Sequence, residues 1–466
     1  MNTPIRIDPV VAAPSSTSSP EAPAAHRRRA PMAVVVAGSL VTGCLAAVTL
    51  VAAPMVPATE SALTGAVLCG FALGWAALAG SSARLTTQRQ RWAAVPAVVL
   101  GASGLTLLAL GSAAHPLIDW VWPLVLFGLA VWMVVRVRRD TGSKAARSLL
   151  YPVIGAMGVA AVGGAYQTVG TAADAVSVAM SGRLVDVGGH RLHLICTGSG
   201  GPPVVVEAGG GELAANLGWI TTAVAHHTTI CVYDRAGRGW SQDADHPQDA
   251  VAIATDLHSL LHRAEVPGPY VITGHSFGGL YAQTFAARYP KEAAGMVLID
   301  STAPHYDGSG VTPAPPAPGS YDVLRRVAAL ASSAGRVGVG RLFAVLAPVD
   351  LPSRERDEVR VGTATPGTIG STIEEYLRAN DSMQEAASLR DFGDKPLVVL
   401  TAGVGSAADW PQKQQRLAHL STDSVHRVVA GASHEDLVGD PTYAATTSRS
   451  ILDVVESVRT GTPLSQ

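Results

Sequence analysis

A serine flanked by glycines is the residue whose surroundings most clearly indicate chemistry, in the run Gly274-His275-Ser276-Phe277-Gly278-Gly279. The run directly follows an apolar stretch expected to form a strand, Tyr270 to Thr273, and it opens a helical stretch, Leu280 to Arg288. A G-x-S-x-G sequence in that context places the serine on a tight strand-to-helix turn, with its hydroxyl exposed at the carboxyl edge of a sheet. The glycines are needed because a Cβ would clash as the backbone doubles back. We therefore predict that Ser276 is a nucleophile.

A histidine is expected to activate this serine, because a hydroxyl is a weak nucleophile at neutral pH and needs a base within hydrogen-bond reach. His434 is the candidate, since it follows the last expected strand, Ser424 to Val429, on a loop directed to the same sheet edge. Other histidines fit less well, because they precede the nucleophile, fall on a helical stretch or lie in a long insertion: His190, His193, His226, His227, His258, His262 and His305.

Two aspartates are candidates for the acid that orients the histidine. Asp300 ends the expected strand Gly295 to Asp300 and would be rigidly placed. Asp409 lies beyond the expected strand Pro396 to Leu400, on a loop rich in Gly, Ser and Ala, where Asp409-Trp410-Pro411 also has the pattern of a helix start. We favour Asp300 and keep Asp409 as the alternative, and the chain order Ser, Asp, His holds with either residue.

Acyl transfer also needs hydrogen-bond donors for the oxyanion that develops in the transition state, each contributing roughly 2.7 to 4 kcal/mol. The backbone N–H of Phe277, just after the nucleophile, is one expected donor. The second is expected from Gly209-Gly210-Gly211, directly after the strand Pro203 to Glu207, and we select Gly210. Glycines leave these amides accessible.

Eight short strands are expected from residue 183 onward, separated by Gly-rich turns and helical stretches. The first two would form an antiparallel hairpin around Gly188-Gly189, and the other six are apolar and largely parallel. Their ranges are Arg183 to Val187, Arg191 to Cys196, Pro203 to Glu207, Thr229 to Asp234, Tyr270 to Thr273, Gly295 to Asp300, Pro396 to Leu400 and Ser424 to Val429. This pattern predicts an α/β domain over residues 183–466.

A long insertion, residues 303–394, separates the sixth and seventh expected strands. It opens with a Pro-rich stretch, Thr312 to Pro318, and continues with helical patterns: Tyr321 to Ser333, Pro352 to Val361, Ser371 to Asn380 and Met383 to Arg390. Long insertions in compact domains are usually functional lids or disordered segments. We interpret this one as a helical cap over the site.

Several motifs of this domain together resemble the α/β-hydrolase superfamily, over roughly residues 183 to 460. They are the hairpin, EAGGG at 207–211, YDRAGRGWS at 233–241, GHSFGG at 274–279, LIDSTAPH at 298–305 and GASH at 431–434. The resemblance implies a serine nucleophile, a histidine base, a carboxylate after the sixth or seventh strand, and no cofactor. Serine at the elbow argues against epoxide hydrolases and haloalkane dehalogenases, relatives that use aspartate there.

The chain departs from that family in two places. The oxyanion loop has Glu207-Ala208-Gly209 where many relatives have His-Gly, and the usual acid spacing after the seventh strand falls on Ser406. The second departure keeps the choice between Asp300 and Asp409 open.

The cysteines predict neither a metal site nor a dense disulfide framework. The chain has four, Cys44, Cys69, Cys196 and Cys231, with no C-x-x-C and no metal-ligand spacing. The resemblance places Cys196 and Cys231 on neighbouring strands. We favour free thiols, because cross-strand geometry often strains a disulfide and buried thiols are common, and we keep a disulfide as the alternative, since an oxidised pair could form outside the cytoplasm.

The first third of the chain has the composition of a membrane domain. Residues 1–30 form a tail rich in Pro, Ala and Ser that is expected to be disordered. Five apolar stretches follow, each long enough to span a bilayer: Met32 to Ala53, Ala62 to Gly80, Ala93 to Ala114, Ile118 to Val135 and Leu149 to Val169. We expect an all-α transmembrane domain over residues 31–170, and a linker over residues 171–182.

The charges between these stretches predict the orientation of the chain. The cations alternate regularly from loop to loop, at Arg27 to Arg29, then at Arg84, Arg89 and Arg91, then at Arg136, Arg138, Arg139, Lys144 and Arg147. The loops Met55 to Glu60 and His115 to Leu117 carry neither lysine nor arginine. By the positive-inside rule the N-terminus is cytoplasmic, and five crossings deliver the α/β domain to the extracytoplasmic side of the cell membrane.

These observations predict a membrane-anchored serine hydrolase of the esterase or lipase type, which cleaves an ester or related acyl bond through an acyl-Ser276 intermediate. The expected substrate is a small-molecule or lipid-like acyl compound, and membrane lipids surround the helices. The net charge of -2 gives no reason to expect nucleic acid. Two alternatives use the same chain, namely an acyltransferase with the same residues and a non-catalytic membrane sensor or scaffold that keeps the fold for binding.

Overall fold

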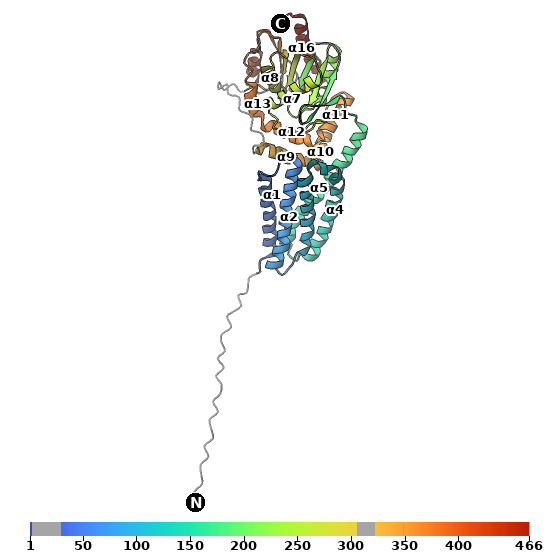
Figure 1. The fold of residues 1–466 in the computed structure, drawn as a ribbon, viewed down its shortest axis with the longest axis vertical. Helices are drawn as coiled ribbons and strands as arrows, with labels where there is room; N and C mark the ends of the chain where they lie inside the picture. Colours follow the sequence, from blue (N-terminus) through green and yellow to red (C-terminus); the bar gives the residue numbers. More distant parts are fainter. Residues whose placement is uncertain (2–28, 305–321, 348, 466) are drawn as a thin grey trace.

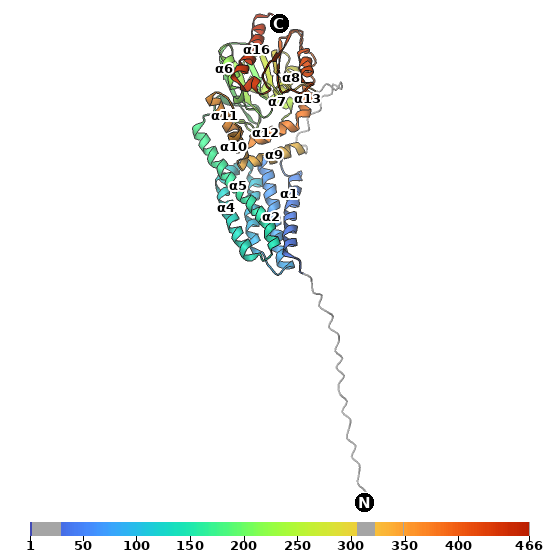
Figure 2. The same cartoon turned by 180° about the vertical axis from the view of Figure 1, so that it is seen from behind.

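The computed structural model describes Met1 and residues 29–304, 322–347 and 349–465. Nearly all of the tail expected to be disordered, the Pro-rich start of the cap and His305 lie outside the described residues. Figures 1 and 2 show a helical bundle beneath an α/β domain, and both views place the cap helices α9 (Val323–Arg336) and α10 (Val339–Leu346) between them.

Five α-helices form the bundle, as the five apolar stretches predict. They are α1 (Met32–Ala52), α2 (Glu60–Leu85), α3 (Ala94–Leu110), α4 (His115–Asp140) and α5 (Lys144–Ser177), with the short turns η1 (Arg91–Ala93) and η2 (Gly111–Ala114) around α3. Among the described residues, four continuous helical stretches are long and apolar enough to cross a membrane: α1, α2, α5 and the run Arg91–Asp140.

The run Arg91–Asp140 folds back on itself and so provides two of the five helices. The chain turns at Gly111, whose φ of +57° is unfavourable for residues with a side chain. The two ends of the run meet, because the Gln90 side chain donates to the Asp140 carbonyl (3.0 Å) and accepts a hydrogen bond from the Thr141 hydroxyl (3.0 Å). Helices α3 and α4 therefore run in opposite directions along the bundle.

Helix α5 corrects one expected boundary. It continues to Ser177, into the range 171–182 that we expected to be a linker. The extension is held by Asp174, whose carboxylate pairs with Arg341 of α10 (2.7 Å) and with Arg360 of helix α11 (Ser353–Thr363; 2.8 Å). Composition alone did not predict this because both partners come from the cap.

The α/β domain is built on a mostly parallel sheet of eight strands in the order β1-β2-β4-β3-β5-β6-β7-β8, which confirms the predicted architecture. Strands β1 and β2 form the expected hairpin, β2 is antiparallel to β4, and the remaining pairs are parallel. The strands are β1 (Arg183–Asp186), β2 (Arg191–Thr197), β3 (Val204–Glu207), β4 (Ile230–Asp234), β5 (Tyr270–His275), β6 (Ala293–Ile299), β7 (Leu397–Ala402) and β8 (Ser424–Val429).

Helices cover both faces of this sheet, which explains why its central strands are apolar without alternation. Helices α7 (Ala250–Arg263), α8 (Gly278–Arg288) and α14 (Trp410–Ala418) pack on one face. Helices α6 (Gly218–Ala225) and α16 (Pro441–Thr460) pack on the other. Short turns η3 (Ala214–Leu217) and α15 (Asp436–Gly439) complete the domain.

The structure joins Cys196 and Cys231 in a disulfide, which is the alternative to the free thiols that the sequence favours. The register of β2 against β4 pairs them directly, with their Cα atoms 4.1 Å apart. Cys44 and Cys69, both in the bundle, are free.

The described part of the cap contains five helices, one more than the sequence pattern predicts. They are α9, α10, α11, α12 (Pro366–Leu377) and α13 (Ala379–Ala386). Helix α10 was missed because only eight residues form it and its bend of 72° from α9 interrupts the helical pattern. The cap is fixed to the bundle through Arg336, which pairs with Glu60 (2.7 Å) and with Asp119 (3.0 Å).

The cap also docks on the α/β domain through a buried carboxyl group, that of Glu385. Glu385 of α13 accepts a hydrogen bond from the Val251 N–H (2.9 Å) at the start of α7, where Asp249 already caps the helix. Burial and the neighbouring Asp249 carboxylate raise the pKa of Glu385 from 4.5 to about 8, although the Val251 N–H opposes them. The folded chain therefore binds this proton more tightly than the unfolded chain does, and stability falls as the pH rises from about 4.5 through 8.

We predict that Glu385→Gln removes this pH dependence. The variant should melt near the wild-type midpoint at pH 5 and above it at pH 8, because glutamine keeps the acceptor without the charge. Melting curves of both proteins from pH 5 to 9 measure the effect. An offset between the two midpoints that is the same at every pH would contradict it.

Candidate active site

The turn after β5 holds Ser276 in a strained conformation. Its φ is +54°, and among the described residues only Glu265 and Asp300 are other non-glycine residues with positive φ. Such strain is costly and gathers at functional sites. A Cβ on Gly274 would collide with the Gly278 carbonyl, and a Cβ on Gly278 would collide with the Glu207 carbonyl. The two glycines therefore permit the sharp turn, as the sequence predicts.

The structure brings His434 and Asp300 together. Their Nδ1 and Oδ2 atoms are 2.6 Å apart. Asp300 directly follows β6 and is 1% exposed, whereas the His434 side chain is 40% exposed. Strands β5 and β6 pair His275 with Ile299, so Ser276 and Asp300 leave adjacent strands at the same level. The sheet register thus places the serine and the aspartate at the same edge.

The Asp300 carboxylate is held by three donors. Its Oδ2 faces His434, while its Oδ1 accepts hydrogen bonds from the Trp410 indole N–H (2.7 Å) and the Ala402 backbone N–H (3.1 Å). Burial alone would raise the pKa of Asp300, but the hydrogen bonds from His434, Trp410 and Ala402 outweigh it and lower the pKa below the ordinary value. The carboxylate is therefore charged at neutral pH and able to orient an imidazole.

The alternative acid, Asp409, lies elsewhere. Its side chain is 60% exposed and pairs with Lys413 one turn further along α14 (2.8 Å). Asp409 precedes the helix as expected, but it makes no side-chain hydrogen bond to the helix start. The neighbouring Trp410, not Asp409, reaches the site. The sequence offered no signal for this role of the tryptophan.

In the described part of the chain, the Ser276 hydroxyl and His434 Nε2 form no hydrogen bond with each other or with another protein group. Both residues are partly exposed. The expected hydrogen bond between the Ser276 hydroxyl and His434 Nε2 is therefore not formed in this conformation, whereas the contact between His434 and Asp300 is.

Two backbone amides expected to bind an oxyanion are without an acceptor among the described residues. In the glycine loop, the Gly209 N–H donates to Glu212 and the Gly211 N–H donates to Glu375 (2.9 Å). This leaves the Gly210 N–H unbonded, and the Phe277 N–H at the start of α8 is unbonded as well. A Cβ on Gly210 would come within 3.2 Å of the Phe277 ring, so the glycine loop lies against the residue that follows Ser276.

A buried charged cluster beneath the glycine loop was not predicted as a functional group. Arg235 donates to the carbonyls of Ala208 (2.8 Å) and Gly209 (2.6 Å), and its guanidinium pairs with Glu375 of α12 (2.9 Å). Glu375 also accepts from the Tyr281 hydroxyl (2.7 Å). The cluster ties the cap helix α12 to the oxyanion loop, so the cap fixes the conformation of that loop. The sequence feature that could have indicated this cluster is the motif YDRAGRGWS at 233–241, which contains Arg235.

Burial and neighbouring charges set the ionisation in this region. Burial raises the pKa of Glu207 to about 7, although Arg235 and the Tyr233 hydroxyl oppose the shift. Burial would also raise the pKa of Glu212, but His275 and the Gly209 N–H outweigh it and lower the pKa to about 2.

His275 links the glycine loop to the loop that carries His434. Its Nδ1 lies 3.1 Å from Glu212 Oε2, and its Nε2 lies 3.2 Å from the His434 carbonyl. Burial lowers the pKa of His275, but the Glu212 carboxylate outweighs it, and the net shift is upward. A protonated His275 donates to both partners and so holds the backbone of His434 in place.

Curated proteins match parts of this chain. An uncharacterized protein of Schizosaccharomyces pombe is 29% identical over 222 residues, which cover 46% of this chain and 39% of that protein. A protein named "Probable transporter efuK" from Hormonema carpetanum is 32% identical over 131 residues, covering 26% and 19%. An uncharacterized vacuolar membrane protein of Saccharomyces cerevisiae is 32% identical over 133 residues, covering 24% and 20%. The matched segments thus span less than half the length of these relatives.

Solved structures match the α/β domain. An enol-lactonase from Burkholderia xenovorans LB400 has a TM-score of 0.44 and 18% identity, and the match covers 59% of this chain and all of that chain. A thermophilic esterase from Thermogutta terrifontis has a TM-score of 0.43 and 22% identity, and the match covers 58% and 94%.

The Alpha/beta hydrolase family matches residues 204–445, which include the strained Ser276 turn, Asp300 and the loop that carries His434. This is just over half of the chain's 466 residues. The chain therefore belongs to the α/β hydrolase family.

Proposed function

We propose that the protein is a membrane-anchored serine hydrolase that cleaves an ester or related acyl bond through an acyl-Ser276 intermediate. The observation that carries the proposal is the 2.6 Å contact between Asp300 and His434 at the sheet edge where the strained Ser276 turn ends β5. The unbonded Gly210 and Phe277 amides support it, because tetrahedral intermediates of acyl transfer need such donors.

In the proposed mechanism, His434 Nε2 accepts the proton of the Ser276 hydroxyl as the serine oxygen attacks the acyl carbon. The Asp300 carboxylate stabilises the resulting imidazolium through Nδ1, and the Gly210 and Phe277 amides bind the oxyanion. His434 then gives the proton to the leaving oxygen, and the acyl–serine ester remains. Water, deprotonated by His434, hydrolyses that ester, which releases the acid and restores Ser276.

The bundle is proposed to anchor the enzyme in a membrane, with the α/β domain outside the cytoplasm. The end of the bundle where α1 begins lies away from the cap (Figures 1 and 2). At that end the Ala30 N–H donates to the Leu85 carbonyl, and the cationic Arg147 donates to the Thr141 carbonyl (2.6 Å). The opposite end meets the cap through Glu60 and Asp119, which pair with Arg336. This distribution agrees with the positive-inside rule. Protease protection in sealed vesicles tests it, and cleavage of the α/β domain only from the cytoplasmic side would overturn it.

Lipid-like acyl compounds are the proposed substrate class, because the cap exposes apolar side chains next to the bundle. Helix α10 leaves Leu342, Phe343 and Leu346 at 54–72% exposed. Both overall views place α10 at the top of the bundle, where the membrane surface would lie (Figures 1 and 2). An apolar helix face at that level fits the boundary between headgroups and acyl chains.

Labelling with a fluorophosphonate probe tests the proposed chemistry, since this probe modifies only an activated serine. Full-length protein in detergent should take one label, on the peptide that contains Ser276, and heat-denatured protein should take none. Well-folded wild type that takes no label would overturn the proposal and favour the non-catalytic scaffold. Release of free acid from a reactive ester, without an added acceptor, would distinguish hydrolysis from obligatory acyl transfer.

A further inference from the structure

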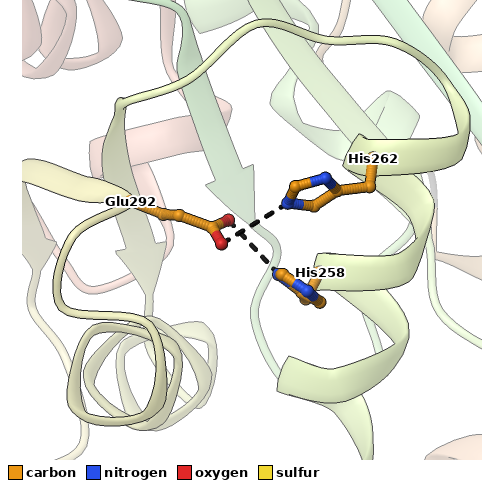
Figure 3. A group of neighbouring side chains, drawn as sticks. All are labelled: His258, His262 and Glu292. Atoms are coloured by element: carbon orange, nitrogen blue, oxygen red, sulfur yellow. Dashed lines mark hydrogen bonds and ion pairs between the residues drawn. The ribbon is translucent and has the colours of Figure 1, made fainter.

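Two histidines and a glutamate converge at the edge of the sheet opposite to Ser276. His258 and His262 lie one turn apart on α7, and Glu292 lies in the turn that enters β6. Figure 3 shows the Glu292 carboxylate facing both imidazole rings, with one interaction to each ring. Glu292 precedes β6 whereas Asp300 follows it, so the cluster is about 25 Å from the proposed active site at the rise of a parallel strand.

The spacing of the donor atoms fits a single cation. Glu292 Oε2 lies 3.2 Å from His258 Nδ1, and Glu292 Oε1 lies 3.4 Å from His262 Nε2. The ligand atoms of all three residues lie within 4.8 Å of one another. Zinc bonds of about 2.0 to 2.2 Å in a tetrahedron put neighbouring ligand atoms about 3.4 Å apart. The two observed nitrogen-to-oxygen distances are close to that value.

We propose that His258, His262 and Glu292 bind a divalent transition-metal cation of the Zn²⁺ class, with water in the remaining position. Two imidazoles and one carboxylate form a donor set that suits zinc, whereas magnesium and calcium prefer oxygen ligands alone. Histidines at positions i and i+4 lie on the same face of a helix, so both rings reach the cation without a change of backbone.

The neighbouring groups preorganise two of the three ligands. The Tyr289 ring stacks on the His258 ring, with centroids 4.0 Å apart and planes within 3° of parallel. The Glu292 backbone is fixed on both sides, because its N–H donates to the Tyr289 carbonyl (2.9 Å) and its carbonyl accepts from the Tyr270 N–H (2.7 Å). Such support around the ligands raises metal affinity by limiting the motions that binding must stop.

The site joins the end of α7 to the turn before β6, and its ligands come together only in the folded chain. A cation bound there stabilises the native state in proportion to its occupancy. The site is separate from Ser276, so the cation acts on stability and takes no part in acyl transfer.

Zinc binding to the full-length, tag-free protein in detergent tests the proposal. After removal of metals with a chelator, calorimetric titration with ZnCl₂ at pH 7.5 should give one ion per chain with a dissociation constant in the micromolar range or tighter. The melting midpoint should rise by several degrees with saturating zinc. Affinity should fall at least about tenfold at pH 5.5, because metal-binding imidazoles must be deprotonated.

Variants of the cluster provide the decisive comparison. His258→Ala and Glu292→Gln should each lose the zinc-dependent rise in melting midpoint while melting like wild type without zinc. His226→Ala/His227→Ala removes two exposed histidines outside the cluster and should bind zinc like wild type. Zinc binding that is unchanged in His258→Ala and Glu292→Gln, or less than one ion per chain at 100 μM zinc in wild type, would overturn the proposal.

Discussion

Replacing Ser276 with alanine is expected to lower kcat for ester hydrolysis by about 10⁶-fold, and His434→Ala should cost about as much. In the proposed mechanism the two residues act in one proton transfer, so the double variant should be no slower than either single variant. A residual rate about 10³- to 10⁴-fold above that in water should remain, because the Gly210 and Phe277 amides are still in place. Steady-state kinetics with a series of chromogenic esters measures all three variants.

His426→Ala is a suitable control for the histidine variant. His426 lies on β8, eight residues before His434, and its ring contacts Thr401 and Gln415 instead of the acid. This control should keep wild-type kcat within about twofold, since surface substitutions are usually small in effect. Ester hydrolysis that survives in Ser276→Ala while disappearing in the control would contradict the assignment of the nucleophile.

The parts of the site that local sequence determines could be predicted. The strand-to-helix turn at Ser276 could be predicted because the glycines around the serine permit it, and its role as nucleophile stays a prediction. His434 was identified because it follows the last strand, and strands of one parallel sheet end at a common edge. Gly210 was identified within its loop, and the structure adds that Glu212 and Glu375 occupy the amides on either side of it.

The sequence favours Asp300 but leaves Asp409 open as the acid, because the choice depends on tertiary contacts. Both aspartates follow a strand, so the position along the chain alone does not show which of them contacts the histidine. The structure separates them through Trp410, which turns its indole N–H onto Asp300 while Asp409 faces Lys413 at the surface. Trp410, the first residue of α14, therefore holds the carboxylate of Asp300, which contacts His434, while the preceding Asp409 stays at the surface.

Contacts across long sequence separations account for the other differences. Glu375 lies 137 residues after Arg238, with which it pairs, so no local pattern could associate the cap with the oxyanion loop. The disulfide depends on the register of β2 against β4, and the length of α5 depends on two arginines of the cap. The fold class could still be predicted, because it follows from the number and polarity of the helices and strands. The disulfide, the length of α5 and the contacts of the cap depend on how the helices and strands pack against each other.

Asp300→Asn is expected to lower kcat by about 10⁴-fold without a matching loss of stability. Two donors, the Trp410 indole and the Ala402 N–H, hold Oδ1, so the amide oxygen of the asparagine should take that place. Its NH₂ group would then face His434 Nδ1, which must become an acceptor and leave the ring proton on Nε2. An imidazole protonated on Nε2 cannot take the proton of Ser276, and the base is lost although its position is kept.

Asp409→Asn is the matched control, because it makes the same chemical change on an exposed residue whose side chain forms an ion pair with Lys413. It should leave kcat within about twofold of wild type, and the melting midpoint should hardly change because exposed ion pairs contribute little. A large loss of activity in Asp409→Asn together with a near-normal Asp300→Asn would reverse the assignment of the acid. In that case the loop after β7 would have to move Asp409 onto His434 when substrate binds, and the contact between Asp300 and His434 would serve only to hold the loop that carries the base.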